Sequence, residues 1–186
     1  MATLPDPTDR LTGADKAMFD HMAAARAHAD GRPELGQVYV RMFNNPGLAA
    51  KVGALGEQIR FNGVLPDDVR EMAILRFAAQ RRYGYEWAHH QRPARLAGVS
   101  QGTVDALTAG RLPAGLSDGA AAAIEAVDAV ADGRSIDAAV QSRVVAAFGL
   151  PGVVELVVLC GLYSIMGDMC IAFDIPIEEG FPRPPF

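Results

Sequence analysis

Apolar residues recur at helical spacing along most of the chain, and no segment shows a convincing alternation of apolar and polar residues. A half-buried strand needs that alternation, so the pattern predicts an all-α fold. Glycines and prolines mark the breaks between elements. The expected helices are 14–29, 36–42, 47–61, 67–82, 85–97, 101–109, 118–131, 136–147 and 152–173. With 186 residues, half of them hydrophobic, and no linker, one domain over 1–186 is expected.

Several helix ends carry specific signals. Pro66, Asp67 and Asp68 stand at the start of the 67–82 segment, where carboxylates interact favourably with the helix dipole. Gly98 is a stop signal, and Ser100 is the expected cap of the following helix.

The charge pattern bears on partners and location. The net charge of −5 is spread without long runs of one sign, so the sequence offers no basic patch for nucleic acid. The segment "MATLPDPTDRL" lacks the positive start and apolar run of a secretory signal. We therefore expect a cytoplasmic protein that does not bind nucleic acid.

The segment "LPGVVELVVLCGLYSIMGDMCIAFDIP" is apolar enough to raise the question of a membrane span. It contains Glu155 and Asp168, and no Lys or Arg flanks it closely. A helix over about 152–173, buried on nearly all sides with help from a neighbouring subunit, is the preferred interpretation, without a membrane. The proline-rich tail "IPIEEGFPRPPF" would then be an extended arm that could lie on a partner.

Cys160 and Cys170 are the two cysteines, ten residues apart in this segment. In a continuous helix they would be roughly 15 Å apart, whereas a disulfide tolerates a Cα separation of at most about 7 Å. We expect buried, unpaired thiols.

Costly side chains gather in "RRYGYEWAHHQRPARLAG", residues 81–98. Glu86 and His90 are four residues apart and share a helix face, as an acid/base pair would. Ala94 and Ala97 continue that face and leave room for a pocket. His89 points a quarter-turn away and is expected to be a solvated neighbour.

Glu71 is the second unusual residue, because Ile74, Leu75 and Ala78 place it on the apolar face of its helix. Buried carboxylates are expensive unless they are paired. One interpretation is a first-turn glutamate satisfied by the helix N-terminus, or by Arg70 or Arg76. The other is a carboxylate that faces His90 across the helix pair, with its pKa raised by burial.

At these residues the chain resembles a known family. The run "REMAILRFAAQRRYGYEWAHHQRPARLAGVS", a core motif at about 70–100, is similar to that of the carboxymuconolactone decarboxylase superfamily, which includes the alkylhydroperoxidase D-like proteins. The shared features are Arg-Glu at the start of an apolar helix, a short turn, Tyr-Glu-Trp, a histidine and a closing Ala-Gly-Val-Ser. The resemblance implies an alkylhydroperoxidase D-like helical bundle that forms homotrimers or hexamers.

The resemblance also assigns residues, since the family's glutamate falls on Glu71 and its histidine on His90. The peroxidase branch carries a Cys-x-x-Cys pair, whose two positions match Tyr83 and Glu86 here. Thiol attack on a peroxide requires sulfur at that site. The chain is therefore expected to belong to a branch that lacks the cysteine pair, such as the decarboxylases.

These observations together predict a carboxymuconolactone decarboxylase-like lyase that acts on a small carboxylated lactone or related ring compound. His90 would move the proton, and Glu71 and Glu86 would set its charge and orientation. The predicted pocket-shaping aromatic residues are Tyr83, Tyr85 and Trp87. The candidates for holding a substrate carboxylate are Arg70, Arg81 and Arg82.

No cofactor and no metal are expected, because zinc would lack three or four convergent ligands in the motif. Two alternatives stay open. One is a peroxiredoxin-type thiol peroxidase that uses Cys160 or Cys170. The other is a non-catalytic member of the family that binds a ligand or partner.

Overall fold

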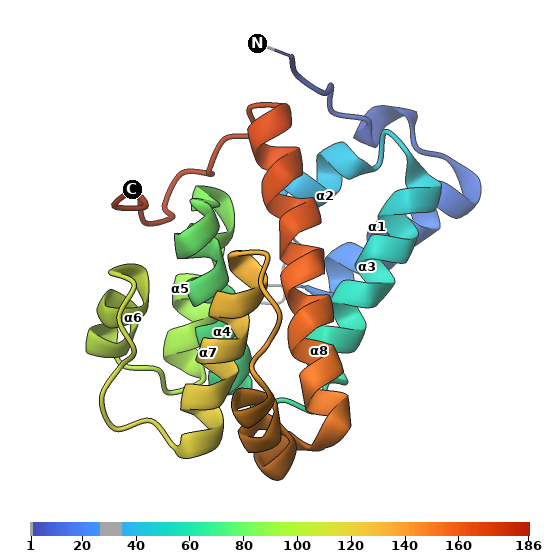
Figure 1. Cartoon of the computed structure of the whole chain (residues 1–186). Helices are drawn as coiled ribbons and strands as arrows, with labels where there is room; N and C mark the ends of the chain where they lie inside the picture. Colours follow the sequence, from blue (N-terminus) through green and yellow to red (C-terminus); the bar gives the residue numbers. More distant parts are fainter. Residues whose placement is uncertain (1, 27–34) are drawn as a thin grey trace.

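A computed structural model describes residues 2–26 and 35–186, and all regular structure within them is helical (Figure 1). A short 3-10 turn, Thr8–Arg10, precedes the helices. The helices are α1 Gly13–Ala25, α2 Gln37–Met42, α3 Pro46–Phe61, α4 Asp67–Arg81, α5 Gly84–Leu96, α6 Gln101–Thr108, α7 Asp118–Ala131 and α8 Ala138–Ala172. The predicted all-α class is confirmed for the described residues.

The predicted boundaries agree with the structure to within a residue from α2 to α7. The first helix is shorter than predicted, because α1 ends at Ala25 with Arg26 as its C-cap. The remainder of that prediction, 27–29, lies outside the described residues. Gly98 has a φ of 88°, and the Ser100 hydroxyl accepts from the Thr103 N–H at 3.1 Å, so the predicted stop and cap are confirmed.

The last two predicted helices form the two arms of α8, which is interrupted at Gly149. Gly149 has a φ of 70° and a ψ of 178°, a backbone conformation that favours glycine. Pro151 follows and has no N–H to donate. The local chemistry therefore kinks the helix where the sequence indicates a break.

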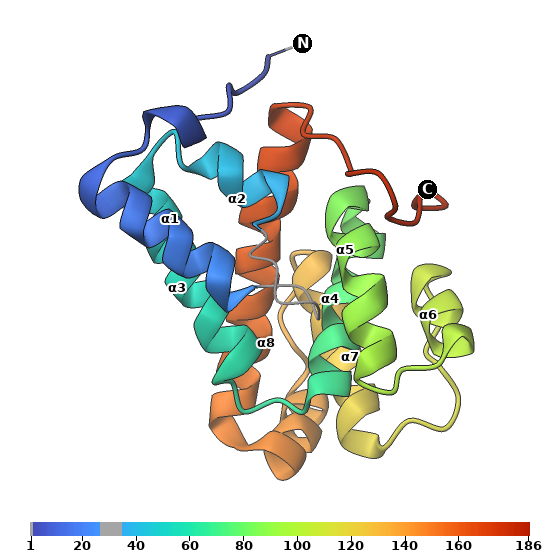
Figure 2. The ribbon, with the colours of Figure 1, turned by 180° about the vertical axis from the view of Figure 1, so that it is seen from behind.

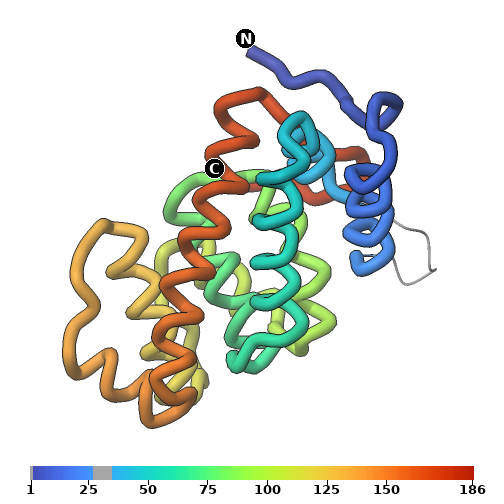
Figure 3. Tube along the Cα trace, turned by 90° about the vertical axis from the view of Figure 1, so that its right-hand side faces the viewer, coloured from blue at the N-terminus to red at the C-terminus, as the bar shows by residue number. Residues whose placement is uncertain are grey.

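Helix α8 runs between two groups of helices (Figures 1 and 2). On one side lie α1, α2 and α3, and on the other α4 packs against α5, α6 and α7 (Figure 3). Every residue from Val69 to Ala78 of α4 is buried, including Arg70, Glu71 and Arg76. The guanidinium of Arg76 is held by both carboxylate oxygens of Asp128, at 2.6 and 2.9 Å. Helix α4 is thus the central element against which the site is built.

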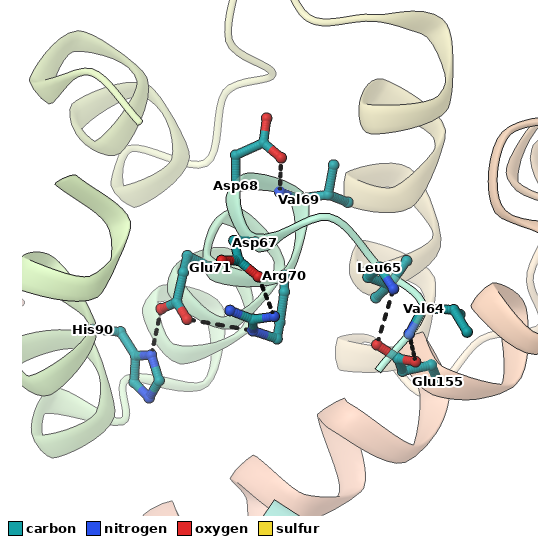
Figure 4. A network of polar contacts seen from close by, with 9 residues as sticks. All are labelled: Val64, Leu65, Asp67, Asp68, Val69, Arg70, Glu71, His90 and Glu155. Atoms are coloured by element: carbon teal, nitrogen blue, oxygen red, sulfur yellow. Dashed lines mark hydrogen bonds and ion pairs between the residues drawn. The ribbon is translucent and has the colours of Figure 1, made fainter. Parts of the chain in front are cut away.

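By length and composition alone, α8 could cross a membrane. It behaves as a core helix, however, because it packs on α4 and α7 and its acidic groups serve the fold. The Glu155 carboxylate accepts from the Val64 and Leu65 N–H groups at 2.7 and 3.3 Å (Figure 4). The Asp168 carboxylate accepts from the Tyr83 hydroxyl at 2.8 Å.

Burial of the C-terminal helix on nearly all sides is not observed in the single chain. The inner face of α8 is buried, with Leu159 and Leu162 almost inaccessible. The outer face exposes large apolar side chains: Leu150, Val154, Val157, Val158 and Ile165. Within the described residues, nothing covers this face fully.

The C-terminal tail lies on its own chain and covers α5. The Phe181 ring stacks on the His89 ring with centroids 3.9 Å apart, and Phe186 meets the Trp87 ring edge-on at 6.1 Å. The predicted extended arm is therefore correct in form, and its contacts are with α5 of the same molecule.

Replacing Gly167 by Ala should destabilise the fold, because a Cβ there would lie 2.2 Å from Cγ of the Tyr83 ring. Overpacking of this kind costs about 1–3 kcal/mol. Gly102→Ala is the control, since a Cβ at this exposed helical position meets nothing nearer than 3.9 Å. That change should stabilise by about 0.5–1 kcal/mol. Urea unfolding measures both, and equal effects would contradict the close packing of α8 on Tyr83.

Candidate active site

The central feature of the site is a hydrogen bond between two buried side chains on neighbouring helices (Figure 4). Nδ1 of His90, on α5, lies 2.7 Å from Oε2 of Glu71, on α4. The two residues are only 6% and 2% exposed. The pairing across the helices that the sequence predicts is therefore confirmed in geometry.

The two arginines suggested as partners of Glu71, Arg70 and Arg76, take different positions. Nε of Arg70 lies 3.5 Å from Oε1 of Glu71, and its NH1 group donates to Asp67 at 2.8 Å (Figure 4). Arg76 is bound to Asp128 instead. Glu71 thus has both a cationic neighbour on its own helix and the histidine partner, and the two alternatives for it are partly combined.

The charge state of this pair follows from its surroundings. Burial acts to raise the pKa of Glu71, but the charge and hydrogen bond of His90, with Arg60 and Arg70, outweigh it and lower that pKa. The predicted raised pKa is therefore wrong. Burial, together with the charges of Arg60 and His89, lowers the pKa of His90 against the opposing charge and hydrogen bond of Glu71. At neutral pH the pair is a carboxylate that accepts from Nδ1–H of a neutral imidazole.

A cavity of about 750 Å³ opens beside His90. Its walls come from α2, α3, α5, α8 and the C-terminal tail, and include Tyr39, Arg60, Glu86, His90 and Tyr163. The Tyr163 ring meets the imidazole edge-on with centroids 5.0 Å apart. Because Glu71 occupies Nδ1, Nε2 of His90 is the nitrogen that can exchange a proton with a molecule in the cavity.

Glu86 is a second buried carboxyl group in the cavity wall, 3% exposed. Its Oε1 atom has no hydrogen-bond partner within the described part of the chain. Burial raises the pKa of Glu86 to about 8, with help from Glu178 and against the opposing effect of Arg60. It shares a face with His90, but the imidazole bonds Glu71, so the structure does not show the orienting contact predicted for Glu86.

Arg60, near the end of α3, is the cation that the sequence analysis missed. It lines the cavity, and no hydrogen bond or ion pair joins it to the residues that the structure describes. Its charge acts to lower the pKa values of both Glu71 and Glu86, although burial outweighs this effect at Glu86. Its place in "EQIRFNG" gave no signal, because α3 joins the cavity only through the tertiary fold.

The three predicted carboxylate-binding arginines do not line the cavity. Arg70 contacts Asp67 and Glu71. Arg81 approaches the Tyr83 hydroxyl at 3.4 Å, and the Arg82 guanidinium lies 5.9 Å from the centre of the Phe186 ring. Arg70 lies in the first turn of α4, whereas Arg81 and the C-cap residue Arg82 lie at its other end.

Of the three predicted pocket aromatics, Tyr85 alone borders this cavity. The Tyr83 hydroxyl donates to Asp168, and Nε1 of Trp87 donates to Thr108 Oγ1 at 2.9 Å. Both rings pack between helices rather than against the cavity. Helical spacing alone does not predict which of these side chains faces the cavity, because consecutive residues of a helix point in different directions around its axis.

His89 is not the solvated neighbour that the sequence predicts. Its ring is sandwiched between Tyr85 and Phe181, with centroid distances of 4.1 and 3.9 Å. Its Nε2 lies 2.7 Å from Glu178. Burial would raise the pKa of Glu178, but His89, the Gln37 N–H and the Tyr85 hydroxyl lower it to about 2. This carboxylate fixes the tail where it forms a cavity wall.

The thiols lie outside the cavity. Cys160 and Cys170 are free and buried, as predicted. Burial raises the pKa of Cys160 to about 12 and also raises that of Cys170, so both favour the unreactive thiol form. Among the described residues, no group of three or more His, Cys, Asp or Glu side chains is placed to hold a metal ion.

Comparison with known proteins finds a family match over part of the chain. Residues 46–129, which include Glu71, Glu86 and His90, match the profile of the Carboxymuconolactone decarboxylase family. Over these residues the chain is similar to that family, as the sequence motif predicts. No curated protein shows a significant match to it.

Two solved structures resemble this chain in fold. The apo debrominase Bmp8 has a TM-score of 0.74 at 16% identity, with 96% of this chain and 92% of that chain covered. A cysteine-to-alanine variant of Bmp8 in complex with 2,3,4-tribromopyrrole has a TM-score of 0.73 at 16% identity, with 91% and 90% covered. At this identity the likeness shows the shared fold alone.

Replacing Glu71 by Gln should lower the pKa of His90 further, because Glu71 is the group that raises it. An NMR titration of the His90 ring in both proteins measures the shift. Glu125→Gln is the control, since Glu125 pairs with Arg143 on another helix. An unchanged His90 pKa in Glu71→Gln would show that the two side chains do not meet in solution.

Proposed function

We propose that the chain is an acid/base enzyme of the carboxymuconolactone decarboxylase type. It acts on a small carboxylated lactone or related ring compound, without a metal or redox cofactor. The observation that carries this proposal is the buried Glu71–His90 pair beside a cavity, with Nε2 left for the substrate. The match of residues 46–129 to the Carboxymuconolactone decarboxylase family supports an enzyme-like protein of this fold.

In this proposal His90 carries the proton. Loss of carbon dioxide from a carboxylate consumes one proton, which must reach carbon. The resting imidazole is neutral, so it takes up a proton from solvent at Nε2 and delivers it to the ring carbon. Glu71 holds the tautomer and stabilises the imidazolium while it exists.

Arg60 takes the role that the sequence assigned to other arginines. A guanidinium without an ion pair among the described residues can bind a substrate carboxylate in a bidentate manner. The cavity volume of about 750 Å³ lies in the usual range for small-molecule sites. The tribromopyrrole bound by Bmp8 is also a small ring, which supports this size class.

The alternatives have less support. A thiol peroxidase would need a reactive cysteine, yet Cys160 and Cys170 are outside the cavity and their pKa values are raised. A non-catalytic binding protein would not need a carboxylate–imidazole pair inside the core, because burying such groups is costly.

The proposal includes a cytoplasmic homo-oligomer, a trimer or hexamer as the family resemblance implies. The exposed stripe Leu150, Val154, Val157, Val158 and Ile165 on α8 supports association. Large contiguous apolar patches on a soluble protein mark interaction sites. Covering this stripe would complete the burial of α8.

His90→Gln should lower turnover of carboxymuconolactone by roughly 10²- to 10⁴-fold, the usual contribution of positioned proton transfer. Steady-state kinetics measures the loss, and circular dichroism checks that the fold persists. The double variant Cys160→Ala, Cys170→Ala is the control and should stay within a few-fold of wild type. Peroxide turnover that disappears in the double variant would instead favour the thiol peroxidase.

Light scattering at micromolar concentration should give a mass of three chains or a multiple of three. Val154→Asp should reduce that mass, because it places a charge within the apolar stripe of α8, where Val154 is 62% exposed. Leu112→Asp is the matched control at another exposed apolar residue, 49% accessible. A monomer mass for the wild type would refute the oligomer.

A further inference from the structure

We propose that Glu86 is the general acid of this site: its carboxylic acid donates a proton to the carbonyl oxygen of the ring substrate. His90 transfers the proton to carbon. This inference rests on the proposed function and replaces the orienting role predicted for Glu86 with a direct catalytic one.

The geometry of α5 places the two groups together. Glu86 lies one helical turn before His90, so both side chains project from the same face, and both line the cavity. Glu86 is buried, and its Oε1 atom has no partner within the described segments. Polar groups buried in a protein are nearly always hydrogen-bonded, and a free one at a cavity wall is available to a ligand.

Burial keeps the carboxyl group of Glu86 protonated, and the surrounding groups modify this effect. The titratable and charged groups that interact electrostatically with Glu86 are Tyr39 on α2, Arg60 on α3, Tyr85 on α5, Tyr163 and Cys170 on α8, and Glu178 in the tail. Arg60 is the one cation in this set and favours the carboxylate, but burial outweighs it and raises the pKa of Glu86 to about 8. At neutral pH the cavity wall therefore holds a carboxylic acid.

The two carboxyl groups of the site consequently differ in charge. The pKa of Glu71 is lowered and that of Glu86 is raised. Pairs of titratable groups whose environments separate their pKa values supply the acid and base of a reaction. Glu71 keeps the imidazole in its proton-carrying tautomer, and Glu86 retains a proton to donate.

The reaction balances with these two groups. When the bond to the departing carboxylate breaks, its electron pair moves through the conjugated ring to the carbonyl oxygen, and carbon dioxide leaves. That oxygen takes the Glu86 proton and becomes an enol. His90 then gives the ring carbon a proton drawn from solvent, and the enol returns its proton to Glu86. The net change is one proton consumed and one carbon dioxide released.

Binding of an anionic substrate should strengthen this arrangement. A carboxylate at Arg60 offsets the charge that favours ionised Glu86 and brings a second negative charge near it. Both effects raise the pKa of Glu86. Benzoate, a ring carboxylate, is a probe for this effect that does not depend on turnover.

The first experiment is a pH titration by NMR of the intact chain with ¹³C-labelled glutamate side chains. One carboxyl signal should titrate near pH 8, vanish in Glu86→Gln and remain in Glu179→Gln, which alters an exposed glutamate at the cavity rim. Benzoate should move its midpoint upward in wild type and not in Arg60→Gln. Ionisation of Glu86 in the ordinary range of glutamate, near about 4.3, would overturn the proposal.

The second experiment is the pH profile of carboxymuconolactone turnover. The wild-type kcat/KM, which reports the free enzyme, should fall as pH rises through about 8, where Glu86 loses its proton, and the fall in kcat should lie at higher pH. Glu86→Gln should lower the rate at neutral pH by roughly 10²-fold and remove the alkaline limb. Because the native pKa of Glu86 lies above its unfolded value of 4.5, its contribution to stability is full below pH 4.5 and is lost as pH rises to about 8. Glu86→Gln should therefore flatten the decline of thermal stability between these two pH values.

The outcomes separate this proposal from the function on which it rests. If Glu86→Gln keeps turnover within twofold while His90→Gln loses it, the acid role of Glu86 is wrong and the proposed function stands. If wild type shows no turnover while Glu86 titrates near pH 8, the proposed function fails, and the assignment of Glu86 fails with it.

Discussion

The rest of the site depends on the buried hydrogen bond between Glu71 and His90. It places a carboxylate and an imidazole inside a core whose other members on α4 are mostly apolar. Leaving one partner of a buried hydrogen bond unsatisfied costs about 1–3 kcal/mol, and more for a charged group, whereas apolar replacement of both partners is often nearly neutral or stabilising. Stability alone therefore does not explain the pair. The proposed function does explain it, because Nε2 can exchange a proton with a molecule in the cavity that His90 lines.

Around this pair, the hydrogen-bond partner decides the charge of each carboxyl group, because burial acts to raise the pKa of both glutamates. Arg60 acts on Glu71, Glu86 and His90 together, yet the two glutamates shift in opposite directions. The difference is the partner: Glu71 has the imidazole, and Glu86 has no partner at Oε1. Arg60 acts in the same direction on both glutamates, so the histidine partner of Glu71 makes the two carboxyl groups chemically distinct.

The features predictable from sequence were those encoded locally. Glycine, proline and capping residues located most helix ends, and the kink at Gly149 appeared as a predicted break. The Glu71–His90 contact was also predictable, because a carboxylate on an apolar face requires a partner and the next helix offered one. Helix spacing also placed Glu86 on the face of His90.

The remaining parts of the site depend on tertiary packing. Arg60, Tyr39 and Tyr163 come from three other helices, and nothing in their local sequence marks them. Periodicity shows that Tyr83 and Trp87 are buried without telling which neighbour each ring meets. The predicted direction of the Glu71 pKa shift was wrong because burial was weighed without the opposing charge and hydrogen bond of His90 and the charges of Arg60 and Arg70.

The carboxylate of Glu178 links the tail to two other parts of the molecule. It accepts from the Gln37 N–H of α2 at 2.9 Å, from the Tyr85 hydroxyl at 2.7 Å, and contacts His89 on α5. The first backbone amide of α2 is therefore shielded from water by a residue of the tail, not by its own helix. Hydrogen–deuterium exchange at the Gln37 amide thus measures how often the tail leaves the cavity wall, independently of any substrate.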